Sequence, residues 1–377
     1  MRYACRKKSR CWKRNISVEE KQKIDEGWRK SEAERRILQN QVLELKGNVR
    51  VFCRLRPPLA NEPPEITAFQ TPGPCEITCF PPGGKRISFT FDRVLNQHIQ
   101  QEEAFEEVSA LVQTALDGYK VCVFAYGQTG SGKTYTMEGD IDGPNRGIIP
   151  RATEQIFDTI EELKARDWSY EVKVSIFEVY NEKFTDLINP DENGRAPEIF
   201  TDKTTKEPVF VNLYRATAEK PSEVQTLIRR AQRRRHVAAT KCNERSSRSH
   251  CVFWMQFSGK NSATEETTAG SVYLVDLAGS ERSEVSGATG VRLQETNDIN
   301  VSLSALDRVF VSIMAKDSHI PYRDSRLTHC LQPCLGGSAK VLMMVNLSPF
   351  DVKESLKTLR FGKKVNQCHI GTARKRC

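Results

Sequence analysis

The 377-residue chain contains no run of 18 apolar residues, so we expect no transmembrane helix and no membrane partner. Its first 15 residues are basic but lack the apolar stretch of a secretory signal. Twelve cysteines occur without a single Cys-x-x-Cys spacing, which argues against a zinc site with four clustered ligands. We therefore expect reduced thiols in a cytosolic or nuclear compartment.

Basic charge is unevenly distributed along the chain, whose net charge is +9. Residues 1–46 carry 14 Lys and Arg against 7 Asp and Glu, a net of +7, and residues 363–377 carry a net of +5. The remaining body therefore has a net charge of −3. A nucleic-acid-binding domain would place a basic stripe on the folded body, so we expect no nucleic-acid partner.

The first periodic segment, residues 17–46, is predicted to be a helix that stops at Gly47. Ser17 and Glu20 have capping-box spacing. Ile24, Trp28, Leu38, Val42 and Leu45 follow a heptad seam that Ser31 and Arg35 interrupt. This pattern fits either an amphipathic helix packed on a domain or the end of a longer coiled coil.

Beyond residue 48 the pattern predicts alternating strands and helices, which favours one α/β domain with a largely buried sheet. Strands are expected at 49–56, 120–126, 170–180, 250–257, 271–277 and 340–347. Helices are expected at 101–116, 151–165, 221–238, 292–315 and 351–368, and residues 59–90 form short strand-like pieces among Pro and Gly.

The segment Gly127-Gln128-Thr129-Gly130-Ser131-Gly132-Lys133-Thr134 fits the pattern G-x-x-x-x-G-K-[ST] between a predicted strand and a helix. In such a loop, backbone N–H groups and the helix N-terminus face phosphate oxygens. Lys133 would supply a full positive charge to the β- and γ-phosphates, and Thr134 would offer its hydroxyl to Mg²⁺. The segment therefore predicts a nucleoside triphosphate site.

Two further segments fit this site. In residues 272–281 an apolar strand ends at Asp276, and an Asp at such a strand end holds the Mg²⁺ shell in P-loop proteins. Residues 243–250 are dense in Ser and Arg. They fit either a solvated polar loop or a segment that supplies hydroxyls to Mg²⁺ and an Arg to a phosphate or carboxylate.

Together, residues 125–137, 243–250 and 275–282 resemble the P-loop, switch I and switch II of kinesin motor domains. Residues 54–57 resemble the kinesin adenine-binding strand, and residues 319–328 resemble the microtubule-binding loop and helix. Residues 44–52 look like the neck-to-motor junction of the kinesin-14 class, and residues 365–373 also resemble that class. The resemblance covers about residues 46–370.

The resemblance implies the P-loop NTPase fold of a kinesin motor: α/β, with a central mixed β-sheet and helices on both faces. ATP and Mg²⁺ are the implied ligands. The chain would comprise a basic N-terminal segment (1–16), a neck helix that ends a coiled-coil stalk (17–47), a motor domain (48–370) and a basic tail (371–377).

The resemblance also assigns site residues. Those implied to bind ATP are Arg54, Pro57, Gly127, Gln128, Thr129, Gly130, Ser131, Gly132, Lys133, Thr134, Tyr135 and Asn243. Those implied to hold Mg²⁺ are Thr134, Ser247 and Asp276. Ser246 and the Gly279 amide would sense the γ-phosphate. Arg248 and Glu281 would pair when the switches close, and Glu281 would relay a proton from the attacking water.

The implied function is that of an ATP-dependent, minus-end-directed microtubule motor with a microtubule-stimulated ATPase. Arg323 and Arg326 would contact microtubules, and a longer stalk would form a homodimer. The cytoplasm, the microtubule cytoskeleton and the spindle are the expected locations, with the nucleus as a second compartment. The chain departs from the family pattern at Val301, Asp307 and Gly362. The changes at Val301 and Asp307 leave one alternative open, a nucleotide-binding but non-motile microtubule crosslinker in which they uncouple the ATPase.

Overall fold

A computed structural model describes residues 18–65, 68–190, 195–205, 207–241, 247–281, 291–336 and 339–368. The chain divides into two compact units, Met1–Leu45 and Lys46–Cys377. No helix in the described part of the chain combines the length and the apolar character needed to cross a bilayer.

The first unit contains one described helix, α2 (Val18–Leu45), which confirms the helix predicted at 17–46. Four residues of the predicted seam are exposed to solvent: Ile24, Leu38, Val42 and Leu45. Gly47 follows the helix with φ +90°, a backbone conformation that favours glycine and ends a helix. Ser17, the predicted cap, lies outside the described residues.

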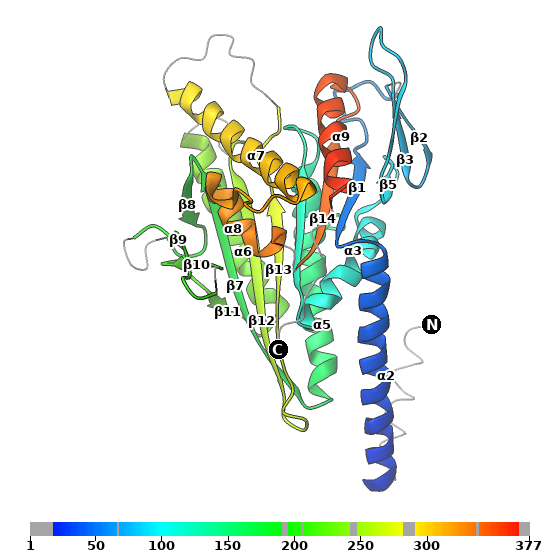
Figure 1. Ribbon diagram of the computed structural model, residues 1–377, viewed down its shortest axis with the longest axis vertical. Coiled ribbons are helices and arrows are strands. Elements are labelled where there is room, and N and C mark those ends of the chain that lie inside the picture. Colours follow the sequence, from blue (N-terminus) through cyan, green and yellow to red (C-terminus); the bar gives the residue numbers. More distant parts are fainter. Residues whose placement is uncertain are drawn as a thin grey trace. The chain divides into compact units, whose positions relative to one another are not determined.

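The second unit alternates strands and helices (Figure 1). Its helices are α3 (Gln101–Leu116), α4 (Lys133–Met137), α5 (Ile148–Lys164), α6 (Pro221–Lys241), α7 (Val291–Ala315), the 3₁₀ turn η2 (Tyr322–Asp324), α8 (Arg326–Leu335) and α9 (Val352–Asn366). Its longer strands are β1 (Val49–Leu55), β6 (Lys120–Tyr126), β7 (Trp168–Tyr180), β12 (His250–Asn261), β13 (Thr267–Asp276) and β14 (Ala339–Leu347). Every predicted strand and helix is therefore present, with ends shifted by a few residues.

The central sheet has the strand order β11-β7-β12-β13-β6-β14-β1-β5, with β8 paired to β7. Its other members are the short strands β5 (Arg93–Leu95), β8 (Lys183–Asp186) and β11 (Ala216–Thr217). β13, β6, β14, β1 and β5 run parallel, whereas β12 is antiparallel to β13 and β7. The sheet is mixed, as expected. Small sheets join β2 (Phe69–Gly73), β3 (Glu76–Cys79) and β4 (Ile87–Thr90), and β9 (Glu198–Thr201) and β10 (Pro208–Val211).

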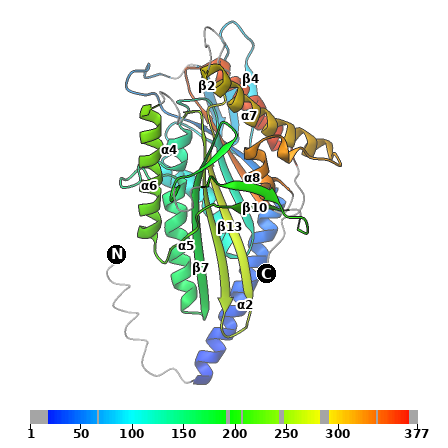
Figure 2. The same cartoon turned by 90° about the vertical axis from the view of Figure 1, so that its left-hand side faces the viewer.

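Helices cover both faces of the sheet, as Figure 2 shows. α3, α5 and α6 lie on one face, and α7, α8 and α9 lie on the other. All residues of β1 and β14 are buried, because helices shield both sides of these strands.

The parallel strands place the chemistry at one edge. Arg54 lies near the carboxyl end of β1, Gly127 follows β6, Asp276 ends β13, and Asn346 lies near the end of β14. Because β1, β14, β6 and β13 are neighbours and parallel, these four residues meet at the same edge of the sheet.

Candidate nucleotide-binding site

The loop between β6 and α4 takes a shape that depends on its glycines. Gly130 and Gly132 have φ values of +75° and +93°, in the region that side chains with a Cβ rarely adopt. A Cβ added to Gly127 would lie 2.3 Å from the backbone oxygen of Asn346. The loop therefore curls tightly and begins α4 at Lys133.

Lys133 and Thr134 face the end of β13. The Lys133 ammonium donates a hydrogen bond to the backbone oxygen of Gln128 at 2.9 Å, and burial lowers its pKa, an effect that Asp276 and Glu281 oppose. Thr134 Oγ1 donates to Asp276 Oδ2 at 2.6 Å. A cationic group at the start of α4 thus lies next to a hydroxyl–carboxylate pair that joins α4 to the end of β13.

A buried ion pair lies behind Asp276. Arg235 on α6 contacts Glu138 at 3.0 Å, and its Nη2 is 3.9 Å from Asp276 Oδ2. Gln232 donates a further hydrogen bond to Glu138 at 2.6 Å. Sequence reasoning missed this group because Arg235 belongs to a basic run that resembles a solvated helix face. The only local signal for Glu138 is its position four residues after Thr134.

The predicted switch segments contact each other and the loop. The backbone N–H of Gly279 donates to the Ser247 backbone oxygen at 2.8 Å. The Glu281 carboxylate accepts hydrogen bonds from the backbone N–H of Thr129, at 2.8 Å, and from its hydroxyl, at 2.5 Å. In this conformation Glu281 therefore contacts the phosphate loop, and its pairing with Arg248 stays a prediction. Asn243 and Ser246 lie outside the described residues.

The opposite end of the site is built around Arg54. Its side chain is buried and donates to Gln101 Oε1 at 2.7 Å and to Thr136 Oγ1 at 3.0 Å. Its guanidinium carbon lies 5.5 Å from the centre of the Tyr135 ring. Gln101 also donates to the Tyr135 backbone oxygen at 2.6 Å, and sequence reasoning missed this residue. Arg54, Pro57 and Tyr135 thus meet around one space.

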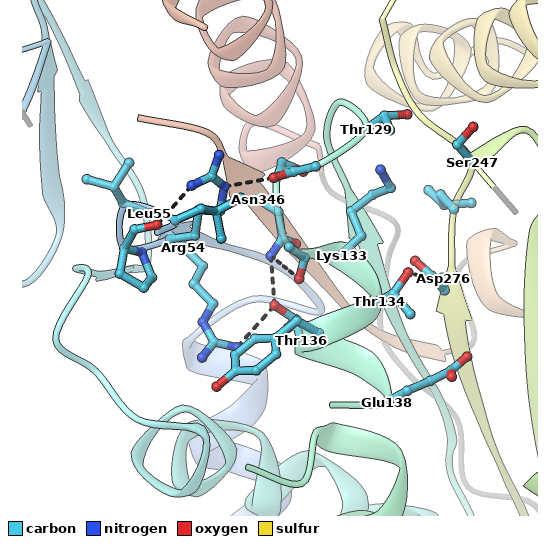
Figure 3. Close-up of a pocket in the computed structure, with 18 of the residues that line it drawn as sticks. Arg54, Leu55, Thr129, Lys133, Thr134, Thr136, Glu138, Ser247, Asp276 and Asn346 are labelled. Carbon is cyan, nitrogen blue, oxygen red and sulfur yellow. Dashed lines mark hydrogen bonds between the residues drawn. The ribbon is translucent and has the colours of Figure 1, made fainter. Parts of the chain in front are cut away.

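That space is a cavity of about 640 Å³, shown in Figure 3. Predicted site residues among those that line it are Arg54, Pro57, Thr129, Gly130, Ser131, Gly132, Lys133, Thr134, Tyr135, Ser247 and Asp276. The side chain of Gln128 instead donates to Asp351 Oδ2 at 3.0 Å, so only its backbone faces Lys133.

Two buried oxygens in this cavity suit the predicted ligands. Asp276 Oδ1 and Ser131 Oγ have no hydrogen-bond partner among the described residues. Buried polar atoms are normally paired, so each is an available site for a water, ion or phosphate. Asp276 Oδ1 fits the hydration shell of Mg²⁺, for which carboxylate and hydroxyl oxygens are suitable ligands.

The residues predicted to contact microtubules lie outside this cavity. Arg323 is in η2 and Arg326 begins α8, and both are exposed. Asp324, between them, forms an ion pair with Arg308 of α7 at 2.9 Å. These arginines are therefore next to α7, on the face of the sheet opposite α5 and α6.

Comparisons with known proteins agree with this geometry. A family model described as the kinesin motor domain matches residues 81–368. The chain is 45% identical over 362 residues to the kinesin-like protein KIN-14C of Arabidopsis thaliana, covering 90% of this chain and 46% of that protein. It is 48% identical to carboxy-terminal kinesin 2 of Xenopus laevis, covering 91% of this chain and 56% of that protein. The chain thus spans about half the length of these relatives.

Solved structures show the same fold. The C-terminal motor and motor homology domain of Kar3Vik1, fused to a synthetic heterodimeric coiled coil, matches with a TM-score of 0.84 and 38% identity. The match covers 96% of this chain and 97% of that one. The motor domain of a Kar3-like kinesin from Ashbya gossypii matches with a TM-score of 0.73, at 40% identity, over 85% of this chain and all of that one. The chain therefore belongs to the kinesin family of motor domains, in its kinesin-14 class.

Proposed function

We propose that the chain is an ATP-driven, minus-end-directed microtubule motor domain whose ATPase is stimulated by microtubules. One observation carries the proposal. Three features lie together at the same end of the sheet, next to one cavity: the loop that ends at Lys133, the Thr134–Asp276 pair and the Gly279–Ser247 backbone contact. A phosphate group in this cavity would be within reach of both switch segments and the loop.

Each group has a separate role in this proposal. Arg54, Pro57 and Tyr135 bind the adenine, while Lys133 and the loop N–H groups bind the phosphates. Thr134 and Ser247 would hold Mg²⁺ directly and Asp276 through water, and the ion would neutralise charge that develops on the phosphates. Little covalent chemistry is left to the protein, so positioning and charge stabilisation account for most of the catalysis.

The switch segments connect hydrolysis to movement. Ser246 and the Gly279 amide would contact the γ-phosphate, and Glu281 would leave Thr129 to pair with Arg248. Loss of the γ-phosphate would release these contacts and shift α7 against the microtubule. Arg323 and Arg326, next to α7, would supply part of the microtubule contact.

The remaining expectations extend the same proposal. Residues 17–47 form the neck, residues 48–370 the motor domain, and the flanking segments 1–16 and 371–377 are basic tails. A longer stalk would form a homodimer. The protein would work on cytoplasmic and spindle microtubules, with the nucleus as a second compartment.

Steady-state ATPase measurements with and without microtubules test the proposal. We expect slow basal turnover that microtubules raise by at least tenfold. Lys133→Ala should reduce both rates to background, since it removes the positive charge nearest the phosphates, while circular dichroism shows an intact fold. Lys164→Ala is the matched control, because Lys164 is exposed at the end of α5.

Two outcomes contradict the proposal. Turnover of Lys133→Ala above a tenth of the unmodified rate would overturn the phosphate assignment. ATP binding and microtubule binding without stimulation of hydrolysis would instead favour the non-motile crosslinker.

A further inference from the structure

His250, the first residue of β12, makes two side-chain hydrogen bonds that connect separate parts of the domain. The residue is 3% exposed. Nδ1 accepts a hydrogen bond from the backbone N–H of Ala278 at 3.0 Å, and Nε2 lies 2.8 Å from Oγ of Ser302. Ala278 follows β13 at the nucleotide edge of the sheet, whereas Ser302 belongs to α7. One buried ring therefore bridges these two elements.

The Ala278 contact fixes the protonation state of the ring. A backbone N–H can only donate, so Nδ1 carries no proton and the neutral ring carries its proton on Nε2. Nε2–H therefore donates to Ser302 Oγ. Burial lowers the pKa of His250 to about 3, with a further contribution from the charge of Lys133. The ring is thus neutral near pH 7 and keeps this tautomer.

The two partners of His250 lie at the two ends of the proposed structural change: Ala278 lies beside the phosphate site, and Ser302 lies on α7. Ala278 is one residue before Gly279, whose N–H donates to the Ser247 backbone oxygen. Any shift of this backbone toward a phosphate would also move the Ala278 N–H and the ring that accepts from it. At the other side, Ser302 is 2% exposed, so its contact with His250 is buried away from bulk water.

We propose that His250 is a positioning residue that couples the backbone at Ala278 and Gly279 to α7 through Ser302. This inference rests on the proposed function and deepens it. His250 is not among the residues that line the nucleotide cavity, so it acts through its two neighbours. Loss of one buried hydrogen bond changes an equilibrium by a factor of about three to ten, and coupling should fall by that factor.

Ser302→Ala tests the inference with a small change, because it removes the hydroxyl on α7 that accepts from His250. We expect unchanged basal ATPase and ATP affinity, and a microtubule-stimulated kcat reduced by about three- to tenfold. Ser304→Ala is the matched control, since it removes an exposed hydroxyl two residues away on the same helix. This control should keep the stimulation of the unmodified chain.

His250→Asn completes a double-mutant cycle. The Asn oxygen can still accept from the Ala278 N–H, but the shorter side chain does not reach Ser302. The single variant His250→Asn and the double variant should therefore lose stimulation to the same extent as Ser302→Ala, which is the signature of one shared interaction.

Three results would overturn the inference while the proposed function stands. Ser302→Ala with full stimulation would show that the bond transmits nothing, and additive losses in the double variant would show two independent effects. A basal rate that falls in proportion to the stimulated rate would show a merely structural role. Absence of stimulation in the unmodified chain would overturn the proposed function itself, and this inference with it.

Discussion

At the scale of single residues, Glu281 has the role that depends most on a change of conformation. Its carboxylate accepts two hydrogen bonds from Thr129, whereas the proposed mechanism pairs it with Arg248 when the switches close. Glu281→Ala should therefore bind ATP normally and hydrolyse it at least about a hundredfold more slowly, because the proton relay is lost. Single-turnover hydrolysis with radiolabelled ATP measures this. Normal hydrolysis would show that neither the relay nor the pairing is needed.

His250 gives a prediction about pH. Its pKa is about 3 in the folded chain, against 6.5 for the ordinary side chain. Below pH 6.5 the unfolded state therefore binds a proton that the folded state does not, and stability falls as pH falls toward 3. Between pH 7.5 and 5.0 the unmodified chain should lose about 2 kcal/mol more than His250→Asn.

Urea unfolding at the two pH values measures this difference. His250→Asn lacks the titrating ring, so its loss of stability between the two pH values gives the contribution of all other titrating groups. Equal losses in both proteins would show that His250 titrates normally in the fold.

The sequence identified site residues that follow each other in a motif, and it missed those that come from distant segments. Gly127 to Thr134 are fixed by one loop, so their spacing alone predicts a phosphate site. Gln101 contacts Arg54, 47 positions away, and Arg235 contacts Glu138, 97 positions away. Nothing in the local pattern around either residue indicates its partner, because the sheet and helix packing bring them together.

At the scale of elements, long buried segments were predictable and short ones were not. β6 and β14 each contain a continuous run of at least five apolar residues, which typifies strands covered on both faces. β9 and β10 have four residues each and, in the described part of the chain, pair with each other, so they are too short to show the two-residue alternation of a strand. α8 continues through Pro333, a residue that normally marks the end of a helix.

Close packing of α9 on the sheet gives a prediction at Gly362. A Cβ at this position would lie 2.7 Å from Val345 Cγ2 and 3.3 Å from Phe91 Cε1. Overpacking costs about 1–3 kcal/mol, whereas Ala favours a helix over Gly by about 1 kcal/mol. Gly362→Ala should therefore lower the free energy of unfolding by about 1 kcal/mol.

Urea unfolding of Gly362→Ala, with Gly27→Ala as control, measures the effect. Gly27 of α2 has no atom within 4 Å of an added Cβ, so that change should cause no loss. A Gly362→Ala protein more stable than the unmodified chain would show that α9 moves freely to accommodate the methyl group.

At the scale of the whole molecule, the uneven charge determines how the domain meets a polyanion. The body carries a net charge of −3, so we expect attachment to an acidic microtubule to use local basic groups such as Arg323 and Arg326. Salt shortens the Debye length from about 10 Å at 0.1 M to about 3 Å at 1 M. Co-sedimentation with microtubules should fall with salt, and less steeply for Arg323→Ala plus Arg326→Ala.

The matched control is Lys164→Ala plus Lys220→Ala, which removes the same charge from exposed positions near α5 and α6. Its salt dependence should equal that of the unmodified chain. An arginine double variant that also keeps the unmodified profile would place the microtubule contact elsewhere.

The proposed neck at residues 17–47 is the basis for the predicted direction of movement. α2 enters the motor domain through Gly47 and Asn48, N-terminal to β1, so a lever here is attached at the opposite end of the chain from a C-terminal neck linker. α2 is 28 residues long, but Ser31 and Arg35 interrupt its apolar seam, and a coiled coil needs an apolar heptad pattern sustained over several heptads. We therefore expect this chain to be monomeric and to move microtubules only when many copies are fixed to a surface.

Gliding of polarity-marked microtubules over surface-fixed chains in ATP tests the central claim most directly. A minus-end-directed motor should drive the microtubules with their plus ends leading. A flexible Gly/Ser insert in place of Gly47-Asn48 should stop directional gliding and leave the ATPase intact. Microtubules that glide with their minus ends leading, or that bind without moving while the ATPase is active, would contradict the account.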